Sequence, residues 1–208
     1  MHGNERLPAL ALASAGIPQI IANPRAVAEN KRYCDQDMNA AFGKAVTDYE
    51  SKRAQELLGL ISPDTTIIDF HSYEADAGPF VILVDPNMLP LALRTGIPRI
   101  VYMKHSVKKG SALINYRKGI SVEVGNHFDP RGFGIAISVA QNLLNNVVQY
   151  TMPNTELFEV YGEITEPGEY ENFVEAQAVG ESFYPIFAKK NTYGNYGLKA
   201  RRVEAFTD

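Results

Sequence analysis

The chain has 208 residues, of which 45% are hydrophobic and 21% charged, and its formal net charge is -4. That length suffices for one domain with a full core, or for a large and a small domain. The mildly acidic balance argues against a broad nucleic-acid surface. The single cysteine, Cys34, excludes an intrachain disulfide and indicates a reducing compartment.

The sequence has no run of the roughly 20 apolar residues that would span a bilayer. Its first residues also lack the basic and apolar segments of a signal peptide. We therefore expect a cytoplasmic protein that binds neither membrane nor nucleic acid.

The amino terminus begins with a pair of candidate metal ligands. Met1-His2-Gly3-Asn4-Glu5 carries a His and a Glu three residues apart, and such a pair can bind one metal ion from a tight turn. Residues 6–17 are rich in Leu and Ala and predict a short helix ending in a turn. Residues 19–22 are a brief apolar run suited to a buried strand.

A long polar segment follows at residues 25–42. Such segments are usually functional or disordered, and the interleaved Tyr33, Met38 and Phe42 favour an ordered loop. Thr47-Asp48-Tyr49-Glu50 then has the form of a capping box, and apolar residues at helical spacing predict a helix as far as Ile61.

Four apolar runs predict β-strands, the first of which delivers His71 at its carboxyl end. They cover residues 65–70, 79–84, 97–103 and 119–124. Asp129 and Pro130 then offer a helix start, and apolar spacing carries that helix to about Tyr150.

Apolar strands separated by helices predict an α/β fold, with a mostly parallel or mixed sheet flanked by helices. After residue 151 the pattern changes to a strand at 157–164, a turn at 166–169 and no strong helical period. We predict a catalytic domain at residues 1–150 and a small β-rich domain at 151–208.

His71 and Glu123 are the candidate chemical groups of this sheet, because ligands bind at the carboxyl ends of strands in open α/β sheets. A lone His at a strand end is more often a hydrogen-bonded structural residue than a metal ligand. A Glu within Ser-Val-Glu-Val-Gly is harder to explain structurally, since a strand buried on both faces should not carry an unpaired carboxylate.

In combination these residues match a catalytic zinc site. Such sites take three His or carboxylate ligands and leave one position for water. His2, Glu5 and His71 would make that set, and Glu123 could take a proton from the water. Asp69 could orient the His71 imidazole, although a purely structural role is equally open.

At this point the motifs closely resemble those of the aspartoacylase/succinylglutamate desuccinylase family, zinc enzymes related in fold to carboxypeptidase A type metallopeptidases. The motifs follow the family's order, with a weaker match in the carboxy-terminal segment from Phe183 to Tyr193. They are His2-Gly3-Asn4-Glu5, Asn23-Pro24-Arg25-Ala26-Val27, Arg32-Tyr33 with Asp37-Met38-Asn39, Asp69-Phe70-His71 and Val122-Glu123-Val124-Gly125.

The resemblance implies roles for individual residues. His2, Glu5 and His71 match the ligands of one zinc ion per chain, and Glu123 matches the general base. Arg25 matches the arginine that binds substrate and stabilises the oxyanion, an effect of roughly 3 kcal/mol. Two further residues match substrate-binding positions, Asn39 and Tyr193.

The chain departs from the family pattern at Ala40, where the family has an arginine that helps to hold a substrate carboxylate. Alanine cannot supply that fork of donors. Either the substrate lacks the carboxylate, or a cation from another loop substitutes. The candidates are Lys104, Lys108, Lys109 and Arg117.

The amino terminus is the second departure. The family carries a strand and a Gly pair before the His-Gly-Asn-Glu turn, and its segment between the positions of Glu5 and Arg25 is longer. We therefore expect the reading frame to start upstream, with Met1 in place of a Val.

These features predict a zinc-dependent amidohydrolase acting on a small N-acylated amino acid. Two alternatives remain open: a catalytically silent relative that binds a small ligand or partner, and a carboxypeptidase acting on short peptides. The loss of the arginine at position 40 argues against the carboxypeptidase, which needs a clamp for the terminal carboxylate. The family resemblance is also compatible with a homo-oligomer.

Overall fold

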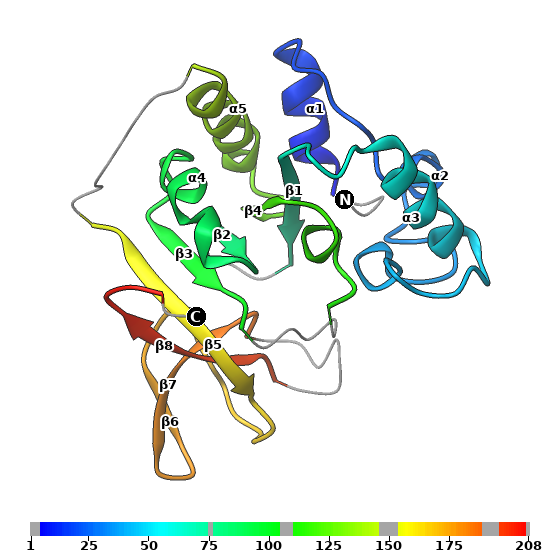
Figure 1. Ribbon diagram of the computed structural model, residues 1–208. Helices are drawn as coiled ribbons and strands as arrows, with labels where there is room; N and C mark the ends of the chain where they lie inside the picture. The colour runs from blue at the N-terminus through cyan, green and yellow to red at the C-terminus, as the bar shows by residue number, and fades with distance from the viewer. Residues whose placement is uncertain (1–4, 75–76, 105–109, 146–153, 189–195, 207–208) are drawn as a thin grey trace.

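The computed structural model describes residues 5–74, 77–104, 110–145, 154–188 and 196–206, and its elements form one mixed sheet flanked by helices (Figure 1). The helices are α1 (Arg6–Ser14), α2 (Pro24–Glu29), η1 (Met38–Ala40), α3 (Tyr49–Leu60), η2 (Pro86–Met88), α4 (Leu89–Leu93), η3 (Leu113–Asn115) and α5 (Arg131–Leu144). The strands are β1 (Ile67–Tyr73), β2 (Phe80–Leu83), β3 (Arg99–Tyr102), β4 (Gly119–Asn126), β5 (Glu156–Glu163), β6 (Ala176–Ala178), β7 (Glu181–Ile186) and β8 (Leu198–Val203).

The strand order is β1-β4-β2-β3-β5-β8-β7-β6. The pairs β1–β4, β2–β3 and β3–β5 are parallel, whereas β2 is antiparallel to β4 and the strands from β5 onward pair antiparallel. The predicted α/β class with a mixed sheet is confirmed. The carboxy-terminal segment is β-rich as expected, and its first strand, β5, continues the sheet by pairing with β3, so the domain division at 151 stays a prediction.

The two faces of the sheet pack against different elements. One face packs against α1, α4 and α5, and strand residues such as Phe70 and Val122 point into that core. In Figure 1, α1 and α5 lie side by side above the sheet. The opposite face packs against Phe173 and Ile186 from the carboxy-terminal segment, while η1 and α3 form a separate cluster beside β1. None of the described helices is long and apolar enough to cross a membrane.

Two predictions over the first third of the chain are wrong. Residues 19–22 form no strand: the side chain of Ile20 is 54% exposed, and Gln19 donates a hydrogen bond back to the Ala9 carbonyl in α1. Within the predicted loop the chain forms α2, which Asn23 caps by accepting from the Ala26 amide, with Pro24 at the first helical position.

Smaller differences concern element ends. The capping box of α3 lies one residue later than predicted, because Asp48 accepts from the Ser51 amide and the Ser51 hydroxyl accepts from the Asp48 amide. β4 continues through Gly125 to Asn126, since Gly125 adopts a φ of 107°. The helix from Arg131 is described as far as Leu144, and residues 146–150 of its predicted extent lie outside the described chain.

Candidate active site

His71 and Glu123 lie opposite one another on paired strands. β1 and β4 run parallel, and His71 is in register with Glu123. Four residues earlier, Ile67 is in register with Gly119, where a Cβ atom would lie 2.2 Å from the Ile67 carbonyl oxygen. Glycine is therefore required where β4 begins against β1, and this close approach sets the register that brings the imidazole and the carboxylate onto one face.

Two further carboxylates flank the His71 ring. The Glu5 side chain, just before α1, places Oε2 3.4 Å from Nδ1, and the Asp69 side chain places Oδ2 2.9 Å from Nε2. Asp69 lies two residues before His71 and so shares its face of β1, as the spacing predicted. A proton on Nε2 would be donated to Asp69, which leaves Nδ1 directed toward Glu5.

The site concentrates negative charge in the protein interior. Glu5 is 3% exposed, His71 3% and Glu123 7%. Burial raises the pKa of Glu123 to about 7, and the nearby Glu5 and Asp69 carboxylates act in the same direction. Burial would lower the pKa of His71, but the Asp69 and Glu5 carboxylates outweigh it and raise that pKa to about 10. The surroundings of His71 therefore favour positive charge.

The donor set fits a divalent cation such as zinc. Buried carboxylates are costly unless they are paired or coordinate a metal, and Glu123 Oε2 is buried without a hydrogen-bond partner among the described residues. Carboxylate and imidazole donors are typical zinc ligands. Glu5 and His71 supply two donors, and no group of three or more candidate ligands occurs within the described ranges. The third predicted ligand, His2, lies outside them.

Of the predicted substrate-binding residues, Asn39 lies beside His71, whereas the Arg25 side chain lies at the surface. Asn39 lies on η1 with Nδ2 3.4 Å from His71 Nε2, so the fold brings it to the site. Arg25 lies near the start of α2, where its side chain is 57% exposed, pairs with Glu29 at 3.1 Å and stacks over the Tyr49 ring. Tyr193 lies outside the described residues.

The four cationic residues that could replace the family arginine include two with structural partners and two outside the described chain. Arg117 donates to the carbonyl oxygens of Ile61 at 2.9 Å and of Leu58, at the carboxyl end of α3. Lys104 lies 3.6 Å from the buried Glu159 carboxylate. Both therefore have structural partners, and Lys108 and Lys109 lie outside the described residues.

Aromatic side chains border the site along the sheet. Phe80 on β2 is in register with Glu123 and only 1% exposed. Its ring lies 5.5 Å from Tyr73 and 5.4 Å from Phe187, in edge-to-face geometry. These rings give the neighbourhood of Glu123 an apolar boundary.

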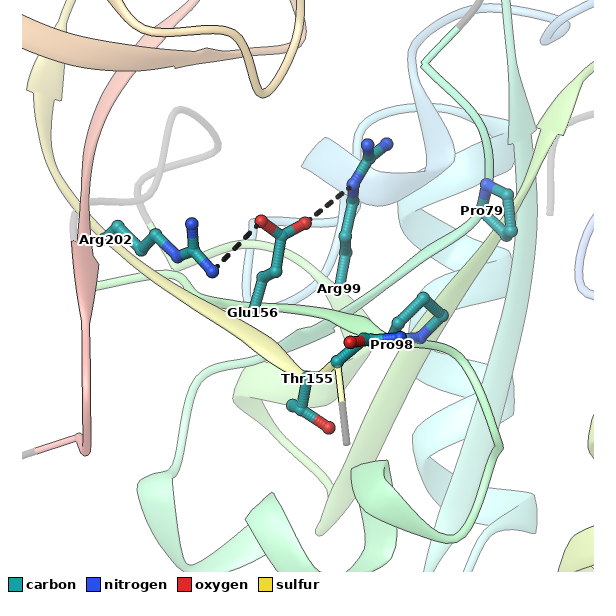
Figure 2. A pocket seen from close by; sticks show the side chains of 7 residues that line it. Pro79, Pro98, Arg99, Thr155, Glu156 and Arg202 are labelled. Carbon is teal, nitrogen blue, oxygen red and sulfur yellow. Dashed lines mark hydrogen bonds and ion pairs between the residues drawn. The ribbon is translucent and has the colours of Figure 1, made fainter. Parts of the chain in front are cut away.

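A cavity of about 440 Å³ lies elsewhere, where β3 and β5 begin. Figure 2 shows Glu156 there between Arg99 and Arg202, with contacts of 3.4 Å to Arg99 and 3.3 Å to Arg202. Both carboxylate oxygens of Glu156 are engaged, and the cavity is lined by none of the predicted site residues. The residues that carry the candidate chemistry are therefore those around His71, not those around this cavity.

The role of Glu50 differs from the one that the sequence predicts. The capping-box pattern includes Glu50, but its carboxylate instead accepts hydrogen bonds from the Cys34, Asp35 and Gln36 amides. Glu50 is the second residue of α3, where an acidic side chain also suits the helix start, and the local sequence carries no signal for donors that lie 14 to 16 residues away.

The fold and the site together define an α/β protein with a buried carboxylate–histidine centre at paired strands. The sequence model of the "Succinylglutamate desuccinylase/Aspartoacylase catalytic domain" matches residues 1–146. The chain therefore belongs to the succinylglutamate desuccinylase/aspartoacylase family.

Individual relatives agree with this assignment. A probable aspartoacylase of Prochlorococcus marinus (strain MIT 9313) is 27% identical over 127 residues, covering 53% of this chain and 42% of that protein. An N-acyl-aromatic-L-amino acid amidohydrolase (carboxylate-forming) of Danio rerio is 42% identical over 76 residues, covering 30% of this chain and 23% of that protein. The chain thus spans less than half the length of these two relatives.

Solved structures share the fold. The succinylglutamate desuccinylase of Chromobacterium violaceum superposes with a TM-score of 0.69 at 20% identity, covering 98% of this chain and 83% of that one. Murine aminoacylase 3 superposes with a TM-score of 0.68 at 19% identity, covering 97% of this chain and 92% of that one.

Proposed function

We propose that this chain is a zinc-dependent amidohydrolase that cleaves the amide bond of a small N-acyl amino acid, releasing a carboxylate and a free amine. The observation that carries this proposal is the buried Glu123 carboxylate, in register with His71 and with one oxygen unpartnered among the described residues. A structural carboxylate would be expected to use its hydrogen-bonding capacity. A free oxygen on a buried carboxylate suits a group that accepts a proton from a bound molecule.

Glu5 and His71 would hold zinc together with His2, the third ligand that the family resemblance implies. When bound, zinc would act as a Lewis acid on the scissile carbonyl and on water. The Asp69 carboxylate fixes the His71 ring through Nε2, so that Nδ1 stays directed at the Glu5 carboxylate.

Side chains of the protein would then transfer the proton and bind the substrate. As water adds to the acyl carbon, Glu123 takes its proton and returns it to the leaving nitrogen when the C–N bond breaks. The Asn39 amide lies beside His71 and would donate to a substrate oxygen. Arg25 would leave its pair with Glu29 to reach the substrate, and this exposed i,i+4 ion pair stabilises its present position only weakly.

The direct test is a substrate panel. Zinc-loaded protein is incubated with N-acetyl, N-succinyl and other N-acyl amino acids and amides, and released amine is measured together with zinc content. We expect hydrolysis of at least one N-acyl amino acid. Stoichiometric zinc without amine release on the whole panel would contradict the proposal and favour a catalytically silent relative.

Glu123→Gln provides the matched loss-of-function variant. The amide is isosteric and uncharged, so a buried charge is removed and folding is preserved, while the proton acceptor is lost. We expect kcat to fall about 10²- to 10⁴-fold with zinc content unchanged. His71→Ala should lose zinc as well, whereas His127→Gln, which changes a buried histidine bonded to Ser72, should retain it.

A further inference from the structure

Another buried carboxylate, that of Glu50, is bonded to two segments that lead to the candidate site. Glu50 is 0% exposed, and its two oxygens accept four hydrogen bonds. Oε1 accepts from Asn23 Nδ2 at 3.0 Å and from the Cys34 amide at 2.6 Å. Oε2 accepts from the amides of Asp35 at 2.9 Å and Gln36 at 3.2 Å.

The first segment that Glu50 holds is the start of α2. Asn23 donates to Glu50 through Nδ2 and accepts from the Ala26 amide at 3.1 Å through Oδ1. One side chain therefore caps α2 and ties its first turn to α3. Arg25 lies in that first turn, so its backbone position depends on this link. In Figure 1, α2 and α3 lie next to each other at the side of the sheet.

The second segment is the loop that leads into η1. Residues 34–36 lie in no helix or strand, and three consecutive amides of this loop point at one carboxylate. Two residues later η1 begins, and its central residue Asn39 places Nδ2 3.4 Å from His71 Nε2. The loop bonded to Glu50 thus leads directly to the residue that approaches His71.

Helix capping does not explain this residue. In the first turn of α3, Asp48 accepts from the Ser51 amide and Asp35 accepts from the Tyr49 amide. Burial would raise the pKa of Glu50, but the hydrogen bonds from Cys34, Asn23, Asp35 and Gln36 hold it below its usual value, so the carboxylate is charged at neutral pH. A buried charge is an expensive way to stabilise a helix, whereas a carboxylate that collects donors from two segments fixes their relative position.

We propose that Glu50 is the positioning residue of the candidate active site, which holds the α2 turn carrying Arg25 and the loop carrying Asn39 in one fixed arrangement around His71. This inference rests on the proposed amidohydrolase function. It assigns Glu50 no contact with substrate: the carboxylate acts through Asn23 and through the amides of residues 34–36.

The primary variant is Glu50→Gln. Glutamine keeps the shape but replaces one oxygen by an NH₂ group, which would face two N–H donors and lose two of the four hydrogen bonds. The matched control is Glu56→Gln, the same change on an exposed site of α3. Asn23→Ser is a milder second variant, because serine retains an N-cap oxygen but loses the donor to Glu50.

Three measurements are made on the full zinc-loaded chain: backbone amide exchange by NMR, the NOE between the Asn39 side-chain amide and the His71 ring, and kcat and KM. In Glu50→Gln we expect at least tenfold faster exchange at residues 34–36, loss of the NOE, and a KM at least tenfold higher with zinc content unchanged. Mere destabilisation would lower the active fraction without raising KM. Glu56→Gln should match the wild type in every readout.

If Glu50→Gln does not fold, Asn23→Ser decides the question. Because the serine oxygen still caps the Ala26 amide, we expect wild-type exchange at Ala26 and at residues 34–36, while loss of the hydrogen bond from residue 23 to Glu50 raises KM. Wild-type exchange, NOE and KM in the folded variants would overturn the positioning role. A wild-type chain that hydrolyses no substrate would instead refute the proposed function, while the exchange and NOE measurements would still determine whether Glu50 holds Asn39 against His71.

Discussion

Asp69 and Glu123 both place a carboxylate near His71 from a β-strand, but the two carboxylates differ in their hydrogen bonding. Asp69 has the imidazole at 2.9 Å, whereas Glu123 Oε2 has no hydrogen-bond partner within the described part of the chain. Both could be identified from the sequence because an acidic residue is conspicuous in an apolar strand. The sequence could not show which of their oxygens stays without a partner. That depends on the β1–β4 register and on side chains 66 residues apart, such as Glu5 and His71.

Asp69→Asn tests the orientation of His71. The amide can still approach Nε2 but no longer supplies a negative acceptor, so the imidazole loses its fixed orientation and some basicity. We expect zinc affinity to fall about 10- to 100-fold, as measured by competition with a chromophoric chelator. Asp64→Asn, at an exposed turn, should leave the affinity unchanged, and an unchanged affinity in Asp69→Asn would show that Asp69 is only structural.

At the level of elements, the segments around the site show what local sequence can predict. β1 and β4 follow from continuous apolar runs, and α3 from its apolar spacing. The strand predicted at residues 19–22 fails because those residues find no strand partner and turn back onto α1. The role of Glu50 depends on amides 14 to 16 residues away, so helix capping was the only reading that local sequence offered.

Asp48→Ala tests the start of α3. Asp48 accepts from the Ser51 amide at 2.8 Å, and loss of an N-cap costs about 1 kcal/mol. Hydrogen bonds from Gln36 and Ser51 lower the pKa of Asp48 to about 2, from an ordinary 3.8. Because the folded-state pKa is depressed, the carboxylate's contribution is complete above about pH 4 and is lost as the pH falls toward 2.

The measurement for Asp48→Ala is urea unfolding of the variant and the wild type between pH 7 and pH 2. The difference in free energy of unfolding should be largest at pH 5 and above and should shrink in acid. A difference that stays constant over this range would contradict an ionised cap. Asp64→Ala serves as the exposed control.

Arg117→Met tests whether this arginine is structural or binds substrate. Its guanidinium donates to the Leu58 and Ile61 carbonyls, and leaving such acceptors unsatisfied costs roughly 1–3 kcal/mol. We expect that loss in chemical denaturation, with KM within twofold of wild type. Arg131→Met, whose arginine pairs with Asp129 at the surface, should change stability less than Arg117→Met does, because exposed ion pairs contribute little. A tenfold rise in KM for Arg117→Met would assign Arg117 to the substrate site.

At the level of the whole molecule, the candidate metal site joins segments far apart in the chain. Glu5 precedes α1, whereas His71 lies in β1, which follows α2 and α3 in the sequence. A cation bound by both would therefore stabilise the native state against unfolding as a whole.

We expect zinc at 100 times its Kd to stabilise the fold by about 2.7 kcal/mol, which for a chain of this size raises Tm by roughly 5–10 °C. Differential scanning calorimetry with zinc and with excess EDTA measures the shift. His71→Ala should show no shift. An equal shift in that variant would place the zinc elsewhere.

The strand order also has a consequence for how this protein folds. β4 lies between β1 and β2, so the central sheet cannot be completed by pairing strands as they emerge from the ribosome. β2 and β3 can pair early, but β1 must wait until β4 has been synthesised, about fifty residues later. Pairing of residues so distant in sequence is slow compared with local contacts. We therefore expect the insertion of β4, which juxtaposes His71 and Glu123, to follow the pairing of β2 with β3, and the chemical centre would assemble only at that step.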